Sequence, residues 1–230
     1  MSCKDIKKSY GTGENKVEAL KKTNLEINSG ELTLLVGPSG SGKTTLVSII
    51  ATILMPDDGE LVLLDRSMNT LSSDDKAIFR CKYIGFVFQS LFLIPTLTIA
   101  ENVALPLVIG GMEEKTAQIK ALDMLEKVHL AHRANETTSN LSKGQQQRVA
   151  IIRAMINDAQ IIICDEPTSS LDHASGFEIM EFLRAIAANS TRTVLVVTHD
   201  QRIFSYADRI ISISDGEITT QGVNDEKKLL

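Results

Sequence analysis

The 230-residue sequence has few cysteines, and the three that it has are far apart. Cys3, Cys81 and Cys164 form no Cys-x-x-Cys pair, so neither a disulfide framework nor a zinc site is expected, and a reducing compartment fits. The sequence also lacks an apolar run of the ~18 residues that cross a bilayer. Its first five residues lack the apolar stretch of a signal peptide, so we expect no lipidation at Cys3. Membrane association is therefore expected to depend on another polypeptide.

An excess of positive charge is also missing, because 24 basic residues face 29 acidic ones and the formal net charge is −5. This mild acidity argues against a nucleic-acid partner, since nucleic-acid-binding proteins usually carry a basic face. Lysines 7, 8, 21 and 22 are interpreted as solvated surface residues. The length and the 43% of hydrophobic residues fit one large globular domain, with room for an inserted subdomain.

What the sequence does contain is an alternation of short apolar runs with longer helical patterns, which is typical of a mainly parallel α/β sheet. The predicted strands cover residues 32–36, 83–88, 161–164, 193–198 and 209–213. The beginning of the chain differs: partial alternation over residues 17–27 and an extended run at 59–64 predict an antiparallel β layer beside that sheet. Gly216 is expected to close a tight turn between two further extended segments.

The segment 90–157 has no convincing strand pattern. Pro95 and Pro106 open it, and apolar residues then recur at helical spacing between residues 117 and 128. Ser142 is a good N-cap for another helix that runs to about residue 155. We therefore predict an inserted α-helical subdomain at 90–157, between core segments 1–89 and 158–230.

The strongest motif is the stretch Gly-Pro-Ser-Gly-Ser-Gly-Lys-Thr-Thr at residues 37–45, between the predicted strand 32–36 and a predicted helix at 46–53. It matches Gly-x-x-x-x-Gly-Lys-Ser/Thr, in which glycines let backbone N–H groups and a helix N-terminus face an anion. Lys43 can reach phosphate oxygens, and the Thr44 hydroxyl suits Mg²⁺, which prefers oxygen ligands. This phosphate cradle alone does not say which phosphate chemistry follows. The residues predicted to contact the nucleotide here are Gly37, Ser39, Gly40, Ser41, Gly42, Lys43, Thr44 and Thr45.

Polar residues follow the other predicted strands. Asp165 and Glu166 end the apolar run 161–164, where Asp165 suits a Mg²⁺ ligand and Glu166 a general base that polarises the attacking water. Gln89 and His199 follow two further strands. Because ligands bind beyond the carboxyl ends of parallel strands, we expect these side chains and the cradle to meet at one edge of one sheet.

With the stretch Leu-Ser-Lys-Gly-Gln-Gln-Gln-Arg at residues 141–148, upstream of the acidic strand, the sequence resembles the ATP-binding subunits of ABC transporters. The stretch resembles the family's Leu-Ser-Gly-Gly-Gln signature, and the resemblance runs from Tyr10 to about Gly216. It implies a single ATPase domain over residues 1–230, with a P-loop NTPase (RecA-like) α/β core and ATP and Mg²⁺ as cofactors.

The resemblance also implies roles for single residues. Tyr10 would stack on adenine. Gln89 would touch Mg²⁺ and sense the permease, and His199 would contact the γ-phosphate. The catalytic residues are then Lys43, Gln89, Glu166 and His199, and the metal ligands are Thr44, Gln89 and Asp165. Further nucleotide contacts are expected from Ser142, Gly144, Gln145 and Asp172.

The resemblance implies that the signature acts on a nucleotide held by a second copy, in a head-to-tail homodimer around two MgATP. Lys143 departs from the family, because it stands where the signature has its first glycine. Lysine is unfavourable if that position needs a positive φ or a close approach of the backbone. If it needs neither, the lysine adds a favourable charge near the phosphate. The dipeptide Ser169-Ser170 departs mildly from the usual Ser-Ala.

Residues 89–107 are similar to the branch that serves lipoprotein release and macrolide export, which implies a subunit on the inner face of the cell membrane, bound to a permease. The same branch leaves a second possibility, a mechanical regulator of a cell-envelope or division complex. A soluble ABC-type ATPase acting on DNA or ribosomes usually needs a coiled coil or tandem cassettes. A phosphate-transferring kinase would not need the signature.

Overall fold

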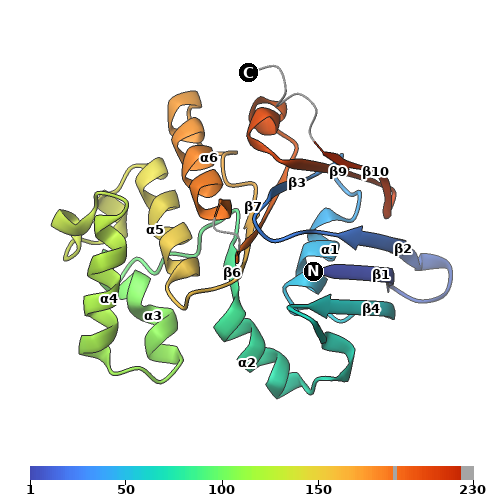
Figure 1. Ribbon diagram of the computed structural model, residues 1–230, viewed down its shortest axis with the longest axis horizontal. Coiled ribbons are helices and arrows are strands. Elements are labelled where there is room, and N and C mark those ends of the chain that lie inside the picture. The colour runs from blue at the N-terminus through green and yellow to red at the C-terminus, as the bar shows by residue number, and fades with distance from the viewer. Residues whose placement is uncertain (189–190, 224–230) are drawn as a thin grey trace.

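The computed structural model describes residues 1–188 and 191–223, so residues 189–190 and 224–230 of the predicted core segment 158–230 lie outside the described residues. Two sheets and a group of helices make up the fold (Figure 1). The six-stranded sheet has the order β10-β9-β3-β8-β7-β6, and its neighbouring strands are parallel except for β10. Its strands are β3 (Leu32–Val36), β6 (Ile84–Val87), β7 (Ile161–Asp165), β8 (Thr193–Thr198), β9 (Arg209–Ser214) and β10 (Glu217–Val223).

The second sheet has the order β2-β1-β4-β5, and its strands pair antiparallel. It consists of β1 (Ser2–Tyr10), β2 (Val17–Glu26), β4 (Asp58–Leu63) and β5 (Arg66–Ser67). The predicted antiparallel layer is therefore confirmed. The predicted C-terminal turn is confirmed too, since Asp215 (φ 47°) and Gly216 (φ 76°) join β9 to β10 with positive φ, as tight hairpins require.

The central strands β7 and β8 are buried on both faces, which explains their continuous apolar runs. On one face Ile163 and Leu195 pack with helix α1 (Lys43–Ile50) and the antiparallel sheet. On the other face Ile162 and Val194 pack with α5 (Lys143–Met155) and α6 (His173–Ala187). The parallel sheet is thus a middle layer, as expected for a P-loop NTPase core, and the predicted fold class is confirmed.

The elements between residues 90 and 157 are all α-helices or short 3₁₀ segments. Helices α3 (Ile99–Ile109) and α4 (Glu114–Glu126) pack with α5 around a separate apolar core, on the side of the molecule away from the antiparallel sheet (Figure 1). Helix α3 starts before Pro106 rather than after it, because Thr98 and Glu101 form a capping box at its N-terminus.

Several element boundaries differ from the sequence prediction by one to three residues. Tyr83 is the last residue of α2 (Ser73–Tyr83) and not the start of a strand. Helix α1 begins at Lys43, three residues before its expected start, because its first turn belongs to the phosphate cradle. The 3₁₀ segments are η1 (Gly13–Asn15), η2 (Met68–Thr70), η3 (Ala131–Arg133), η4 (Thr138–Asn140) and η5 (Gln201–Tyr206). Within residues 1–188 and 191–223, no helix is both long enough and apolar enough to cross a bilayer.

Candidate nucleotide-binding and catalytic site

The turn between β3 and α1 can be made only by glycine at two positions. A Cβ atom on Gly37 would lie 2.1 Å from the carbonyl oxygen of Ile213. Gly42 has a φ of 99°, and a Cβ there would lie 2.4 Å from the carbonyl oxygen of Ala19. The chain at these points therefore passes directly against backbone of β9 and β2, and the remaining residues of the turn form an open loop at the N-terminus of α1.

Lys43 lies inside this loop. Its Nζ donates to the carbonyl oxygens of Gly37 at 2.8 Å and Pro38 at 2.7 Å. Partial burial lowers the pKa of Lys43, against the opposite effect of the charges of Glu166 and Asp165. The Ser41 side chain is 3% exposed, and its Oγ has no hydrogen-bond partner among the described residues. Lys43 thus gives the loop a cation that fits a phosphate, whereas Gly37 and the buried Ser41 do not line the pocket that the loop borders.

The order of the parallel strands brings the predicted residues together. Strand β8 lies between β3 and β7, and β6 lies beyond β7, so the carboxyl ends of four strands share one edge. They open into one pocket of about 440 Å³. The pocket is lined by Ala19, Ser39, Gly40, Gly42, Lys43, Thr44, Thr45, Gln89, Asp165, Glu166 and His199.

Glu166 has an unusual backbone conformation for a residue with a side chain. Its φ is 49°, in the left-handed region, and its N–H donates to the Val197 carbonyl oxygen at 2.9 Å. Its Oε1 lies 2.5 Å from Nδ1 of His199, and its Oε2 accepts a hydrogen bond from the Thr198 hydroxyl at 3.3 Å. The Glu166 side chain is only 11% exposed, whereas that of His199 is 70% exposed. A largely buried carboxylate therefore lies beside an exposed imidazole.

Oxygen atoms suitable for Mg²⁺ face the same pocket. Thr44, Gln89 and Asp165 line it and offer a hydroxyl, an amide carbonyl and a carboxylate. Burial raises the pKa of Asp165, the neighbouring Glu166 charge adds to this, and Lys43 opposes it. A carboxylate whose charge is disfavoured in this way gains from a nearby cation. The donor set therefore fits a magnesium ion that would also take oxygens from a nucleotide.

The signature residues lie at the N-terminus of α5 and do not line this pocket. Ser142 caps the helix: its Oγ accepts from the Gln145 N–H at 3.3 Å, and its own N–H donates to Oε1 of Gln145 at 3.0 Å. A Cβ on Gly144 would lie 3.3 Å from Cβ of Ser175 on α6. Lys143 is the first helical residue and is not among the residues with positive φ, so its backbone conformation does not require glycine.

Tyr10 and Asp172 are also outside the pocket. Tyr10 ends β1 and is 46% exposed. Asp172 caps α6 with both carboxylate oxygens, which accept from the Ser175 N–H at 3.0 Å and the Ser175 hydroxyl at 2.8 Å, and these bonds lower its pKa. Sequence reasoning missed Ala19, which lines the pocket, because an alanine carries no chemical signal. It also missed Thr198, whose signal was a polar residue at the end of an apolar strand.

Comparison with known proteins places these features in a family. Residues 20–169 match the family described as ABC transporter. The chain is 43% identical to the uncharacterised ABC transporter ATP-binding protein MJ1508 of Methanocaldococcus jannaschii, over 95% of this chain and 97% of that protein. It is also 43% identical to the macrolide export ATP-binding/permease protein MacB of Pasteurella multocida, over 94% of this chain but only 33% of that protein.

Among solved structures, the chain is similar to the dimeric post-hydrolysis state of the ATP-binding cassette MJ0796 of Methanocaldococcus jannaschii, bound to ADP and Pi. The TM-score is 0.87 at 40% identity, and the alignment covers 97% of this chain and 98% of that one. The matched family segment contains the cradle, the signature and the acidic strand. This chain therefore belongs to the ABC transporter family, in which it is an ATP-binding and ATP-hydrolysing cassette.

Proposed function

We propose that two copies of this chain close head-to-tail around two MgATP and that hydrolysis drives a membrane permease. The observation that carries the proposal is the separation of the parts within one chain. Lys43, Glu166 and His199 line the pocket, whereas Ser142, Gly144 and Gln145 stand apart from it on α5. The signature helix N-terminus has a partial positive charge that suits a phosphate, so a second copy can supply it. The dimeric form of the relative MJ0796 supports this arrangement.

In the proposed reaction, each group in the pocket has one task. The loop N–H groups and Lys43 hold the phosphates, and Tyr10 and Asp172 contact the nucleotide and the second copy. Thr44, Gln89 and Asp165 hold Mg²⁺, which neutralises phosphate charge when bound. Glu166 orients and polarises the attacking water. His199 turns away from the Glu166 carboxylate and contacts the γ-phosphate.

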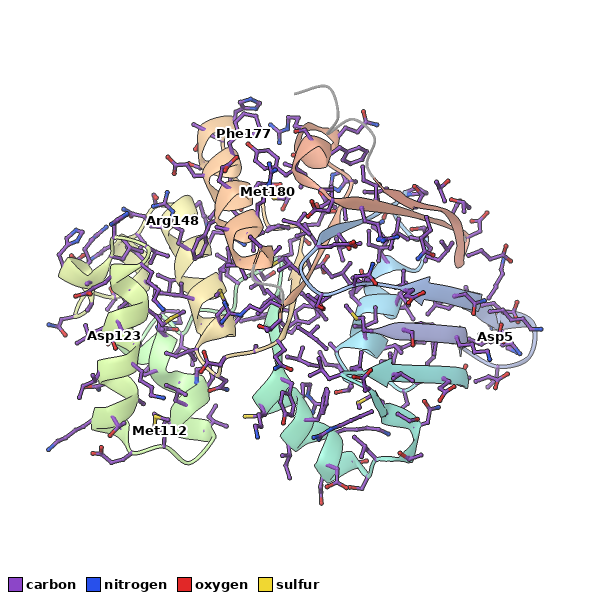
Figure 2. The ribbon with its side chains drawn as sticks, viewed as in Figure 1. Asp5, Met112, Asp123, Arg148, Phe177 and Met180 are labelled. Atoms are coloured by element: carbon purple, nitrogen blue, oxygen red, sulfur yellow. The ribbon has the colours of Figure 1, made fainter. Side chains whose placement is uncertain are left out.

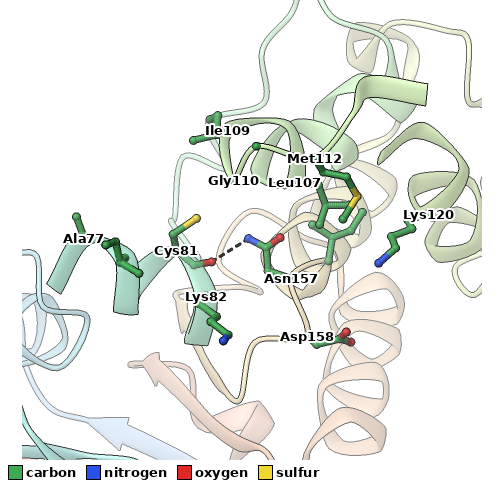
Figure 3. Close-up of a pocket in the computed structure, with 13 residues that line it drawn as sticks. Ala77, Cys81, Lys82, Leu107, Ile109, Gly110, Met112, Lys120, Asn157 and Asp158 are labelled. Atoms are coloured by element: carbon green, nitrogen blue, oxygen red, sulfur yellow. Dashed lines mark hydrogen bonds between the residues drawn. The ribbon is translucent and has the colours of Figure 1, made fainter. Parts of the chain in front are cut away.

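A second cleft offers the surface for the permease. It encloses about 870 Å³ between α2 and the C-terminal ends of α3 and α5 (Figure 3). The exposed apolar side chains Ile78 and Ile109 line it. The Asn157 amide, which follows α5, donates to the Cys81 carbonyl oxygen of α2 at 2.8 Å (Figure 3). We propose that a segment of the permease binds here and in the neighbouring loop after Gln89, which holds the cassette on the cytoplasmic face of the membrane.

The name of the relative MacB, a macrolide export protein, supports an export role. The resemblance of residues 89–107 to the lipoprotein-release and macrolide-export branch leaves a macrolide or a lipoprotein as the proposed class of cargo. The chain corresponds to about a third of that relative, which joins the ATP-binding part to a permease part in one protein. These relatives favour transport over the mechanical regulator of an envelope or division complex. The proposed division of labour is a catalytic core at residues 1–89 and 158–230 and a signature subdomain at 90–157.

The test is the oligomeric state of a hydrolysis-deficient form. Glu166→Gln is expected to lose nearly all turnover, because the amide cannot take a proton from water, and to form dimers on size-exclusion chromatography only with MgATP. Adding Lys43→Ala to that variant should abolish the dimer, while Glu60→Gln on the exposed surface of β4 should behave as wild type. Normal turnover in Glu166→Gln, or a monomer in saturating MgATP with the permease present, contradicts the proposal.

A further inference from the structure

Thr198 is the last residue of β8, and its side chain is completely buried. Strand β8 lies between β3 and β7, where Thr198 is opposite Val36 and Val197 is opposite Asp165. The residue therefore stands between the start of the phosphate cradle and the end of the acidic strand. The other β8 residues from 194 to 197 are apolar, so a hydroxyl at this position departs from the pattern of the strand.

The contacts of the Thr198 hydroxyl determine which hydrogen bond it accepts and which it donates. Its Oγ1 accepts from the Asp200 N–H at 3.0 Å. Because that contact uses a lone pair, the single hydroxyl hydrogen is free to be donated to Oε2 of Glu166 at 3.3 Å. This distance is long for an O–H···O bond, and orienting contacts commonly tighten when substrate binds.

The two oxygens of Glu166 are held in different ways. Oε1 faces His199, whose side chain is 70% exposed, and Oε2 faces the buried Thr198. When His199 turns to a γ-phosphate, Oε1 becomes free to accept a proton from water, while Thr198 keeps its hold on Oε2. We infer that Thr198 is a positioning residue that fixes the Glu166 carboxylate so that its other oxygen faces the attacking water. The inference rests on the proposed role of Glu166 as the base.

The test compares Thr198→Val, which keeps the shape and removes the hydroxyl, with Thr198→Ser, which keeps the hydroxyl. Thr198→Val is expected to lower kcat about tenfold, because the base loses an orienting hydrogen bond to its charged carboxylate, with the KM for ATP unchanged. Thr198→Ser should restore most of the turnover. Thr33→Val is the matched control, because Thr33 is equally buried on β3 and its hydroxyl has no hydrogen-bond partner among the described residues.

A second measurement separates this role from general support of the loop at His199 and Asp200. Added to Glu166→Gln, Thr198→Val should leave the MgATP-dependent dimer unchanged, since Thr198 is inferred to position the base and not to support nucleotide binding. Wild-type turnover in Thr198→Val, equal losses in the Val and Ser variants, or a weakened dimer in the double variant would overturn the inference. If Thr198→Val does not fold, Thr198→Ala is compared with Thr198→Ser in the same way. Normal turnover in Glu166→Gln alone would instead refute the proposed base.

Discussion

Glu166 lies where backbone strain and electrostatic repulsion coincide. Its φ of 49° costs a non-glycine residue about 1–3 kcal/mol, which the bond from its N–H to Val197 and the contacts of its side chain offset. The charge of Glu166 also adds to burial in raising the pKa of Asp165 next to it. Such an arrangement is unfavourable for folding alone, and it is typical of residues retained for chemistry.

At the residue scale we therefore expect Glu166→Gln to stabilise the protein that it inactivates. Removal of one of two adjacent charges should raise the free energy of unfolding by about 1 kcal/mol, which is about 2–4 °C in Tm for a domain of this size. Differential scanning fluorimetry without nucleotide measures the shift. The matched control is Glu60→Gln, an exposed residue of β4 outside the pocket that Asp165 lines, which should leave Tm unchanged. A lower Tm for Glu166→Gln would contradict this account of the site.

Helix α5 connects several parts of the molecule. Its N-terminus carries the signature, and Arg148 lies on its side (Figure 2). The Arg148 guanidinium pairs with Glu178 of α6. Near its other end, the Arg153 guanidinium donates to the carbonyl oxygens of Leu91 and Phe92 in the segment after Gln89. Leu91 and Phe92 both have positive φ, at 55° and 44°, so this segment makes a turn that its residue types do not favour. Arg153 therefore holds this turn on α5, the same helix whose N-terminus carries the signature.

At the scale of this element, Arg153→Met is expected to lower the free energy of unfolding by about 1–3 kcal/mol, because two carbonyl groups lose their charged donor. Urea denaturation followed by circular dichroism measures the change. Lys115→Met provides a control, since it removes an exposed cation from α4. Equal stability of Arg153→Met and wild type would show that the turn is held by other contacts.

On the scale of the whole molecule, the two concave regions lie on different parts of the fold. The pocket at the edge of the parallel sheet is polar and lined by the predicted catalytic residues. The cleft beside α2 and α3 exposes apolar side chains, of which Ile109 is 72% exposed. Exposed apolar groups gathered in a cleft are typical of a surface that another protein covers. A substitution in this cleft can therefore test the proposed permease binding without changing the pocket at the sheet edge.

We accordingly expect Ile109→Asp to weaken copurification with the permease from detergent-solubilised membranes by at least about tenfold, since a buried unpaired carboxylate costs several kcal/mol. The ATPase rate of the isolated cassette should not change. Val17→Asp is the matched control, because Val17 is 63% exposed on β2, outside the cleft. Undiminished copurification of Ile109→Asp would mean that the permease binds elsewhere.

The sequence by itself determined the features that depend on neighbouring residues. The glycines and Lys43 between a strand and a helix predict the phosphate cradle, and Ser142 followed by Gln145 predicts a helix start, because caps and tight turns obey local steric and hydrogen-bond rules. Buried strands were identified by their apolar runs. The same local reasoning was wrong for Pro106, which was expected to precede a helix and instead lies inside α3.

Only the tertiary structure decided which distant residues meet. Thr198 contacts Glu166, 32 positions away in the sequence, because β8 lies beside β7 in the sheet. Arg153 contacts Phe92, 61 positions away, because α5 packs against the loop after β6. Strand order and helix packing come from the burial of many side chains at once, so no single motif specifies them. For the same reason Ala19 and the apolar cleft became visible only in the folded chain.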